Sequence, residues 1–377
     1  MTNNFNKCVE IIDRDFDLEE ATVDLLASRI VGIDTESNSR FHYPEQLCLV
    51  QMATESTVFL IDTIQVRDMS RLRGFLEDQS IIKVIHDANY DVQCFARHQG
   101  LKVRGIFDTS IAARFLGFNS FGLESVVEGV TGKKIAKNER LQRSDWGKRP
   151  LPSEAIDYAA NDVRFLAQIY EVLEKRLRSL GRLSWVLEEC ERVEQIKYTN
   201  LGWESAYLRM GTTGNLDGRE LAVLKQLCQF RESEAIKTHK PPAYILSNEA
   251  MIFLAKHPEN DLLTVPGLHE GVVARIGAGL TRAIIAGKNA PPEEIFKVPY
   301  LRKSRQELTR LDRLKEWRTK VGALVQIEPS LVWPKQSLEC LAEDPGCFDD
   351  SNCMVNVRKW QKQEFGETLR AFIKTIA

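Results

Sequence analysis

Apolar and polar residues follow two different periods along this chain. In the first third, short apolar runs bounded by turn-forming residues predict strands over 30–36, 46–53, 57–62, 81–85 and 103–107. The short connections between the first strands predict an antiparallel meander. An entry helix is expected over 9–28, and Asp108 is expected to cap a helix. Because strands and helices alternate beyond residue 80, we expect a mixed sheet with helices on its faces.

The clearest helical period follows an irregular, basic stretch over 118–152. Pro152 blocks a helix from continuing backwards, and Ser153 is the expected N-cap. Apolar residues then recur at three- and four-residue steps, at Ile156, Ala159, Val163, Leu166, Tyr170, Leu173 and Leu177. Tyr158 and Asp162 stand one helical turn apart at the edge of this face. A carboxylate there is costly unless another group compensates its charge.

The second half of the chain has no convincing strand pattern and is predicted to be helical. We expect helical units over 217–290 and 301–377, joined by linkers at 201–216 and 291–300. The predicted architecture is an α/β domain over 1–200 followed by two all-α domains. A length of 377 residues is sufficient for such an arrangement.

Charge and cysteine usage narrow the functional classes only slightly. The formal net charge of −2 neither requires nor excludes nucleic acid. Locally, 131–150 carries seven Lys/Arg against two acids, and 301–320 carries eight against three. Such segments could contact phosphates, although most basic runs are solvated surface.

The eight cysteines are scattered, without a Cys-x-x-Cys pair. The N-terminus has no apolar signal core, and no apolar run is long enough for a bilayer. We therefore expect a cytoplasmic protein with free thiols and no membrane association. Cys340, Cys347 and Cys353 lie close together, but no nearby histidine completes a zinc site, so none is expected.

Two acids, Asp34 and Glu36, end the first predicted strand. Because strand side chains alternate, the two carboxylates share one face. They repel each other unless a cation lies between them, and such oxygen ligands suit Mg²⁺ or Mn²⁺. The same spacing recurs at Asp17 and Glu19, where we expect a solvated helix face. The pair alone is therefore weak evidence for a metal site.

Asp91, at a predicted helix start, and Asp162 could meet this pair at one edge of the sheet. Four acids there would bind two divalent metals roughly 3.5–4 Å apart, as in phosphoryl transfer. Tyr158 could then hold the attacking water. Taken singly, Asp91 would be an N-cap or surface acid, Asp162 an ion-pair partner of a residue such as Arg164, and Tyr158 a packing residue.

Taken together, these residues resemble the three motifs of the DEDDy 3′–5′ exonuclease superfamily. The motifs are Asp34-x-Glu36, the block HDANYD that ends in Asp91, and Tyr158-x-x-x-Asp162. The sequences LQRSDWGKRPL over 141–151 and DYAANDVRFL over 157–166 are very similar to the signature of the ribonuclease D family. Residues 217–290 resemble an HRDC domain, and the last unit resembles a second one more weakly.

The resemblance implies an RNase H-like fold and two Mg²⁺ or Mn²⁺ ions. It implies hydrolysis of single-stranded RNA from the 3′ end to nucleoside 5′-monophosphates, with tRNA precursors as the usual substrate, and we expect a monomer. By motif, Asp34, Glu36 and Asp162 would hold the metal that bears the attacking water. Asp34 would bridge to a second metal supported by Asp91, and Tyr158 would orient the nucleophile.

Two alternatives remain: a DNA exonuclease of the same superfamily, and a non-catalytic nucleic-acid-binding protein that kept the fold. The second is disfavoured because no acid of the motifs is missing. Among residues that could contact substrate, Phe41 and Tyr43 would stack on terminal bases. Arg143 and Lys148 would contact phosphates, and His86 would contact the substrate. Core or loop packing is an equal alternative for Phe41 and Tyr43, and a structural role is at least an equal alternative for His86.

Overall fold

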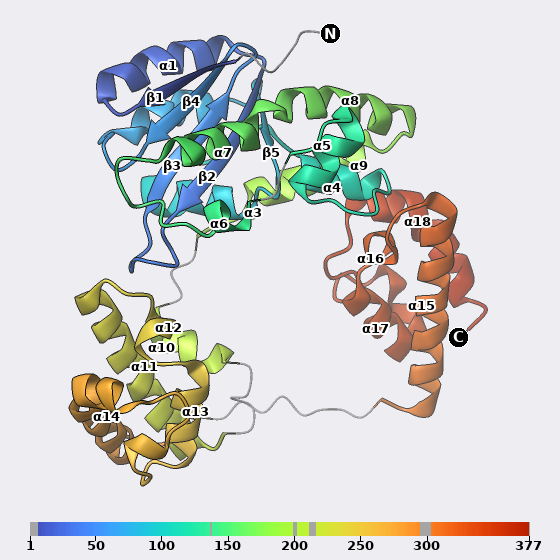
Figure 1. Cartoon of the computed structure of the whole chain (residues 1–377). Helices are drawn as coiled ribbons and strands as arrows, with labels where there is room; N and C mark the ends of the chain where they lie inside the picture. The colour runs from blue at the N-terminus through green and yellow to red at the C-terminus, as the bar shows by residue number, and fades with distance from the viewer. Residues whose placement is uncertain (1–6, 136–137, 199–201, 211–215, 295–302, 377) are drawn as a thin grey trace.

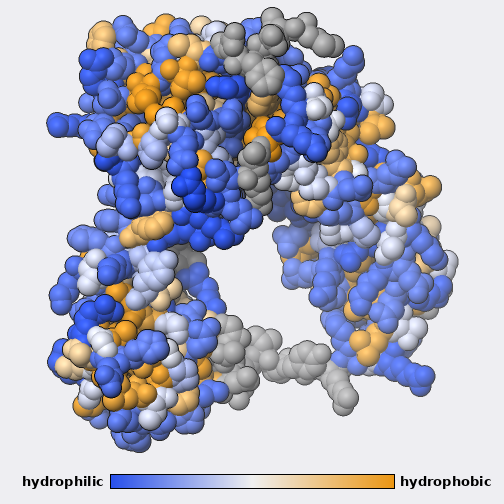
Figure 2. Space-filling model, in the orientation of Figure 1, coloured by the Kyte–Doolittle hydropathy of each residue, from blue (hydrophilic) through white to orange (hydrophobic). Residues whose placement is uncertain are grey.

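The computed structural model describes residues 7–135, 138–198, 202–210, 216–294 and 303–376. In these ranges the chain forms a sheet-containing unit and two helical units (Figure 1). The space-filling view shows an opening framed by the three units and a mostly polar outer surface (Figure 2).

A six-stranded sheet forms the centre of the first unit. Its spatial order is β1 (Cys8–Ile12), β4 (Thr57–Asp62), β3 (Leu47–Ala53), β2 (Ile30–Ser37), β5 (Ile82–Ile85) and β6 (Ile106–Asp108). β3 runs antiparallel to both β2 and β4, whereas β5 is parallel to β2 and to β6. The expected mixed sheet and its antiparallel meander are confirmed.

The predicted entry helix over 9–28 is wrong in its first part. Residues Cys8–Ile12 form β1, which pairs parallel with β4, and the helix α1 covers only Asp15–Ala27. β1 is an edge strand with mostly exposed or partly exposed side chains. It therefore lacks the apolar run by which buried strands are recognised.

Helices cover both faces of the sheet (Figure 1). Besides α1, the short and long helices of this unit are η2 (Met69–Leu72), α2 (Arg73–Leu76), α3 (Asn89–Cys94), η3 (Phe95–Gln99), α4 (Thr109–Phe115), α5 (Leu123–Thr131), α6 (Glu139–Gln142), α7 (Ser153–Arg164), α8 (Leu166–Ser179) and α9 (Leu183–Glu194). The stretch 118–152, expected to be irregular, thus contains α5 and α6. Val126 and Val127 of α5 are buried, and this apolar pair was too short to indicate a helix.

The predicted long helix is divided at Phe165, where α7 ends and α8 begins. The apolar stripe continues across both helices, so its period could not reveal the break. Pro152, and not Ser153, occupies the N-cap position of α7. Asp108 caps α4 as expected, because its side chain accepts from the Ser110 and Ile111 backbone N–H groups.

The first helical unit has a hydrophobic core of its own. It contains α10 (Trp203–Ala206), η4 (Tyr207–Arg209), α11 (Gly218–Thr238), α12 (Pro242–Ile245), α13 (Asn248–Lys256), η6 (Leu262–Thr264) and α14 (Glu270–Asn289). Tyr207 and Met210 are buried in this core, so residues 202–210 of the predicted linker belong to the unit. Residues 201, 211–215 and 295–300 of the two predicted linkers lie outside the described residues.

The second helical unit shares its core with the sheet unit. It contains α15 (Arg305–Val325), α16 (Pro329–Val332), α17 (Lys335–Glu343), η7 (Pro345–Asp349) and α18 (Lys359–Ile373). Trp360 of α18 stacks on Trp185 of α9, with ring centroids 4.8 Å apart. Glu189 of α9 accepts from the Arg358 guanidinium at 2.9 Å. This unit is therefore fixed to the sheet unit by both apolar and charged contacts.

Cysteine pairing differs in part from the expectation. Cys347 and Cys353 form a disulfide, because the turn around η7 brings their Cα atoms to 6.0 Å. The other cysteines in the described ranges are free. None of the helices in those ranges is long and apolar enough to cross a bilayer.

Candidate active site

Gly32, Asp34 and Glu36 alternate along β2 and face the same side of the sheet. The junction of α7 and α8 rests on Gly32. A Cβ atom at Gly32 would lie 2.9 Å from the Val163 carbonyl oxygen and 2.9 Å from Leu166 Cβ. Only glycine therefore lets α7 approach β2 this closely, and this approach brings Asp162 to the acids of the strand.

Asp34, Glu36 and Asp162 offer carboxylate oxygens that all lie within 4.8 Å of one another. Burial, followed by the charge of Asp162, raises the pKa of Asp34 to about 8. Burial also raises the pKa of Asp162 to about 7, opposed by a hydrogen bond with Tyr158. The pKa of Glu36 is raised well above its usual value by burial and then by Asp34. The raised pKa values mean that the surroundings of these three carboxylates do not stabilise three negative charges. A divalent cation would stabilise them, so the group fits such an ion.

Asp91, on the first turn of α3, is buried beside this group. Its carboxylate accepts a hydrogen bond from Thr35 Oγ1 at 2.6 Å. Burial and then the charge of Asp34 raise the pKa of Asp91. Thr35 was missed by sequence reasoning. The alternation that puts Asp34 and Glu36 on one face puts Thr35 on the other, so no sequence signal pointed to it.

The start of α3 is held by a second buried acid, Asp108 on β6. Asp108 Oδ1 accepts from the Asp87 N–H at 3.1 Å, and Oδ2 accepts from the Ala88 N–H at 2.9 Å. Asp87 has a left-handed backbone with φ of 59°, which a non-glycine residue adopts only when its surroundings impose it. Asp108 therefore fixes the turn that directs Asp91, besides capping α4. Its cap role could be read from the sequence, but its contact with this turn could not.

Tyr158 lies on α7 one turn before Asp162 and packs against Trp146, with ring centroids 6.2 Å apart. Trp146 is 1% exposed, so the loop before α7 is anchored directly behind the tyrosine ring. Burial, followed by the charge of Asp162, raises the pKa of Tyr158. The phenol therefore remains a hydrogen-bond donor at neutral pH.

The predicted substrate-contact residues have different surroundings. The Tyr43 hydroxyl donates a hydrogen bond to Glu232 of α11 at 2.5 Å, so this side chain is bound to the first helical unit. His86 Nδ1 lies 2.8 Å from Thr109 Oγ1, a contact within the sheet unit. The structure does not bring either residue into the group of acids.

The remaining three candidates are on the surface. Phe41 is 45% exposed on the loop that follows β2. Arg143 and Lys148 are also exposed, and Arg143 lies 3.3 Å from Glu139. These side chains are available to a ligand but are not positioned by the fold.

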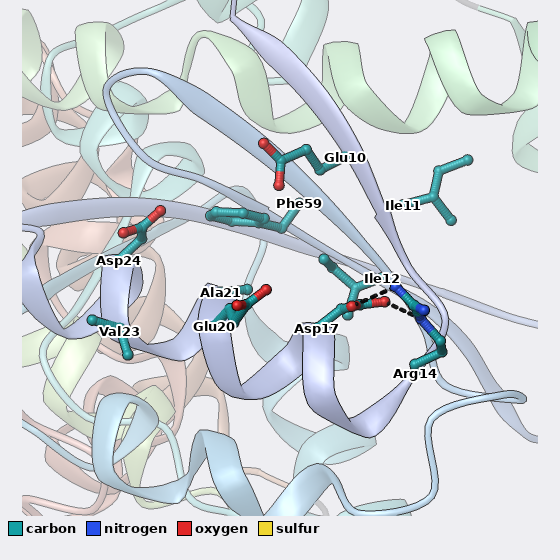
Figure 3. Close-up of a pocket in the computed structure, with 10 residues that line it drawn as sticks. All are labelled: Glu10, Ile11, Ile12, Arg14, Asp17, Glu20, Ala21, Val23, Asp24 and Phe59. Atoms are coloured by element: carbon teal, nitrogen blue, oxygen red, sulfur yellow. Dashed lines mark hydrogen bonds and ion pairs between the residues drawn. The ribbon is translucent and has the colours of Figure 1, made fainter.

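A groove of about 570 Å³ lies elsewhere, between β1 and α1 (Figure 3). Glu10 enters it from β1, and Glu20 and Asp24 enter it from α1. Its Arg14 and Asp17 are paired at 2.7 Å. The acids are spread along an open surface, so this groove does not bring carboxylates together as the group of Asp34, Glu36 and Asp162 does.

A second group of possible ligands consists of Glu45, Cys94 and His98. Here the Arg97 guanidinium lies 2.6 Å from Glu45, and the His98 ring nitrogen lies 3.6 Å from the same carboxylate oxygen. Glu45 thus already has the cationic Arg97 as a partner, and its pKa is lowered by hydrogen bonding to His98 and then by Arg97. This group is an ion-pair cluster.

Comparison with known protein families assigns the sheet unit and the first helical unit. The sequence profile of the 3′–5′ exonuclease family matches residues 9–178, and that of the HRDC domain matches 220–284. The chain is 32% identical to ribonuclease D of Granulibacter bethesdensis over 301 residues, which are 78% of this chain and 75% of the relative. It is 30% identical to ribonuclease D of a Shewanella species over 289 residues, or 74% of each chain. The fold is similar to that of RNase D of Escherichia coli, with a TM-score of 0.77, 23% identity, and coverage of 97% of this chain and 99% of that one.

Proposed function

The chain belongs to the ribonuclease D family and is a 3′–5′ exoribonuclease, and we propose that it shortens the single-stranded 3′ ends of structured RNA precursors. Precursors of tRNA are the expected substrate, and nucleoside 5′-monophosphates are the expected product. The Escherichia coli enzyme of similar fold is described as an exoribonuclease involved in structured RNA processing. The observation that carries the proposal is the convergence of Asp34, Glu36 and Asp162 beside Tyr158.

The enzyme depends on divalent metal ions, as its superfamily does. We propose that Asp34, Glu36, Asp91 and Asp162 hold two Mg²⁺ or Mn²⁺ ions. An oxygen-only ligand set suits these hard cations, and relief of carboxylate repulsion would favour their binding. Bound ions would lower the pKa of a water molecule and neutralise charge on the leaving 3′ oxygen.

The side chains of the protein would orient the reactants. Tyr158 keeps its proton, so its hydroxyl can donate a hydrogen bond to a water molecule or to a phosphate oxygen. Trp146 limits the movement of the Tyr158 ring. Asp108 and Thr35 together fix Asp91, the first through the turn before α3 and the second through its hydroxyl.

We further propose three functional units: an exonuclease domain over 1–200, an HRDC domain over 217–290, and an HRDC-like domain over 301–377. The helical units would add surface for RNA, and the basic segment 131–150 would lie at the entry to the site. The exposure of Arg143 and Lys148 supports this role for the segment. The enzyme would act as a monomer and without zinc.

The test is a nuclease assay on 3′-labelled single-stranded RNA and DNA of matched sequence, with Mg²⁺, Mn²⁺ or a chelator. We expect RNA to be shortened stepwise from its 3′ end, and the chelator to stop the reaction. Asp34→Ala should reduce turnover by roughly a thousandfold, or about 4 kcal/mol of activation free energy. The proposal fails if Asp34→Ala trims RNA at the parent rate, and its substrate assignment fails if DNA is preferred.

Asp17→Ala is the matched control, because Asp17 and Glu19 have the same Asp-x-Glu spacing on α1. Asp17 is paired with Arg14 and is not a member of the group formed by Asp34, Glu36 and Asp162. This variant should retain the parent rate.

A further inference from the structure

Gln51 is a fully buried polar residue in the middle of the sheet. Its side chain is 0% exposed, yet neither Nε2 nor Oε1 has a hydrogen-bond partner in the part of the chain that the structure describes. Most buried amides are paired, because leaving one unpaired costs free energy. An unpaired buried amide in a well-packed core therefore requires an explanation.

The strand pairing places Gln51 directly opposite Asp34. On β3, Gln51 pairs with Asp34 of β2 on one side and with Leu60 of β4 on the other. Directly opposed residues point to the same face, with Cβ atoms roughly 4.5–5.5 Å apart in antiparallel pairs. The amide therefore lies on the face of the sheet that carries Asp34.

Few other groups on this face could pair with the amide. β3 is flanked by β2 and β4, so nearby backbone groups are used in the ladders on both sides. Helix α7 lies across these strands (Figure 1), and its buried residues are Ala155, Ala159, Ala160 and Val163, which are apolar. Asp62, the next acid on this face, is already held by Arg149. Of the two residues paired with Gln51 across the strands, Asp34 has a polar side chain and Leu60 does not.

We propose that Gln51 is a positioning residue for Asp34: when Asp34 holds a divalent cation, the Gln51 amide N–H donates to its carboxylate and fixes its orientation. The inference rests on the proposed function, because it takes Asp34 as a metal ligand. A ligand carboxylate must be ionised, and an ionised carboxylate accepts a stronger hydrogen bond than a neutral acid. Residues that hydrogen-bond to ligands commonly tune the affinity of a metal site.

This arrangement couples the fold to metal binding in a particular way. Without metal, the unpaired amide destabilises the folded state. With metal, the amide gains a partner, and the gain adds to the affinity of the site. Replacing Gln51 by an apolar residue of similar size should therefore stabilise the metal-free protein and weaken metal binding. The first effect follows from the unpaired amide alone, whereas the second is specific to a role at Asp34.

The test uses the full chain, treated with a chelator, and the variant Gln51→Met. Thermal unfolding without metal should shift upwards by roughly 2–4 °C. Titration with Mn²⁺, followed by the electron paramagnetic resonance signal of the free ion, should show an affinity about tenfold lower. Gln51→Leu should give the same two signs and provides a second variant of different shape.

Gln361→Met is the matched control. Gln361 is also buried, but its amide donates to the Leu331 carbonyl at 2.7 Å and accepts from the Arg358 N–H at 2.9 Å. This variant should lower the unfolding temperature and leave Mn²⁺ affinity unchanged. The proposal is overturned if Gln51→Met fails to raise the metal-free unfolding temperature, or if it leaves Mn²⁺ affinity unchanged.

Asp34→Asn, measured in parallel, separates the two proposals. If Asp34→Asn retains Mn²⁺ binding, the assignment of the metal site is wrong. If it loses binding while Gln51→Met does not, only the role of Gln51 is wrong.

Discussion

Asp34 and Asp62 lie on the same face of one sheet, but their surroundings are opposite. Asp62, at the end of β4, is 5% exposed and accepts from Arg149 Nη2 at 2.8 Å and from the Ile64 N–H at 3.0 Å. Asp34, two strands away, has the acids Asp162 and Glu36 as its neighbours. The comparison shows that burial of an acid does not by itself indicate function. What distinguishes the site is that the neighbours of its carboxylates are other acids, whereas the neighbour of Asp62 is the cation Arg149.

The largest effect of a single substitution on stability should come from removing Arg149, the cation that pairs with Asp62. Arg149→Met leaves a buried carboxylate without its partner, which costs about 3–5 kcal/mol of unfolding free energy. Urea unfolding of the parent and variant would measure the loss. In contrast, Asp34→Asn should increase the stability of the metal-free protein, because it removes one of several repelling carboxylates.

The double variant Arg149→Met with Asp62→Leu sharpens this difference. It replaces the ion pair by apolar groups, so it should recover a large part of the lost stability. If the double variant is as unstable as Arg149→Met alone, the loss would arise from the other Arg149 contacts, such as that with the Cys48 carbonyl.

The next effect concerns pH. The folded protein keeps the proton of Asp162 up to about pH 7 and that of Asp34 up to about pH 8, whereas an unfolded aspartate loses its proton near pH 4. Between these values the folded state binds more protons, so raising the pH lowers its stability. The slope is about 1.4 kcal/mol per pH unit for each additional proton.

Thermal unfolding of metal-free protein between pH 5 and pH 8 tests this expectation. The unfolding temperature should fall as the pH rises, and saturating Mg²⁺ should flatten the curve. Asp162→Asn should reduce the slope without metal. A metal-free curve that is already flat would mean that the acids are compensated by groups of the protein.

The smallest effect should come from Asp108, which is buried and, like Asp62, accepts hydrogen bonds from groups of the protein. Asparagine caps helices as well as aspartate does, so Asp108→Asn should retain the α4 cap. Its amide NH₂ would face the Ala88 N–H, at a cost of about 1–3 kcal/mol, and the turn that directs Asp91 would loosen. Both stability and RNA turnover should decrease.

Asp217→Asn is the control for this change, because Asp217 caps α11 through the Arg219 and Glu220 N–H groups and contacts no turn of the site. Urea unfolding and initial rates on RNA would compare the two variants. Equal results for both would mean that Asp108 acts only as a helix cap.

Much of the site could be predicted because it depends on local periods. Alternation along a strand placed Asp34 and Glu36 together, and helical spacing placed Tyr158 beside Asp162. Features that depend on pairing between distant segments could not be predicted. The opposition of Gln51 and Asp34 requires the strand register, and the close approach at Gly32 requires the position of α7.

Two elements of the fold were predicted wrongly because local periods in the sequence do not reveal them. β1 is defined by its pairing with β4 and not by its own weak pattern. The break at Phe165 lies within an unbroken apolar stripe. In each case the deciding interaction lies outside the window in which a sequence period can be recognised.

The stacking of Trp185 on Trp360 has a consequence for synthesis of the chain. A growing chain emerges from the ribosome N-terminus first, and contacts between distant residues must wait for the later partner. The sheet unit, although made first, cannot cover the apolar surface of α9 until α18 has emerged. The first helical unit, whose core is its own, has no such delay. The surface of α9 is therefore one of the last parts of the sheet unit to be covered.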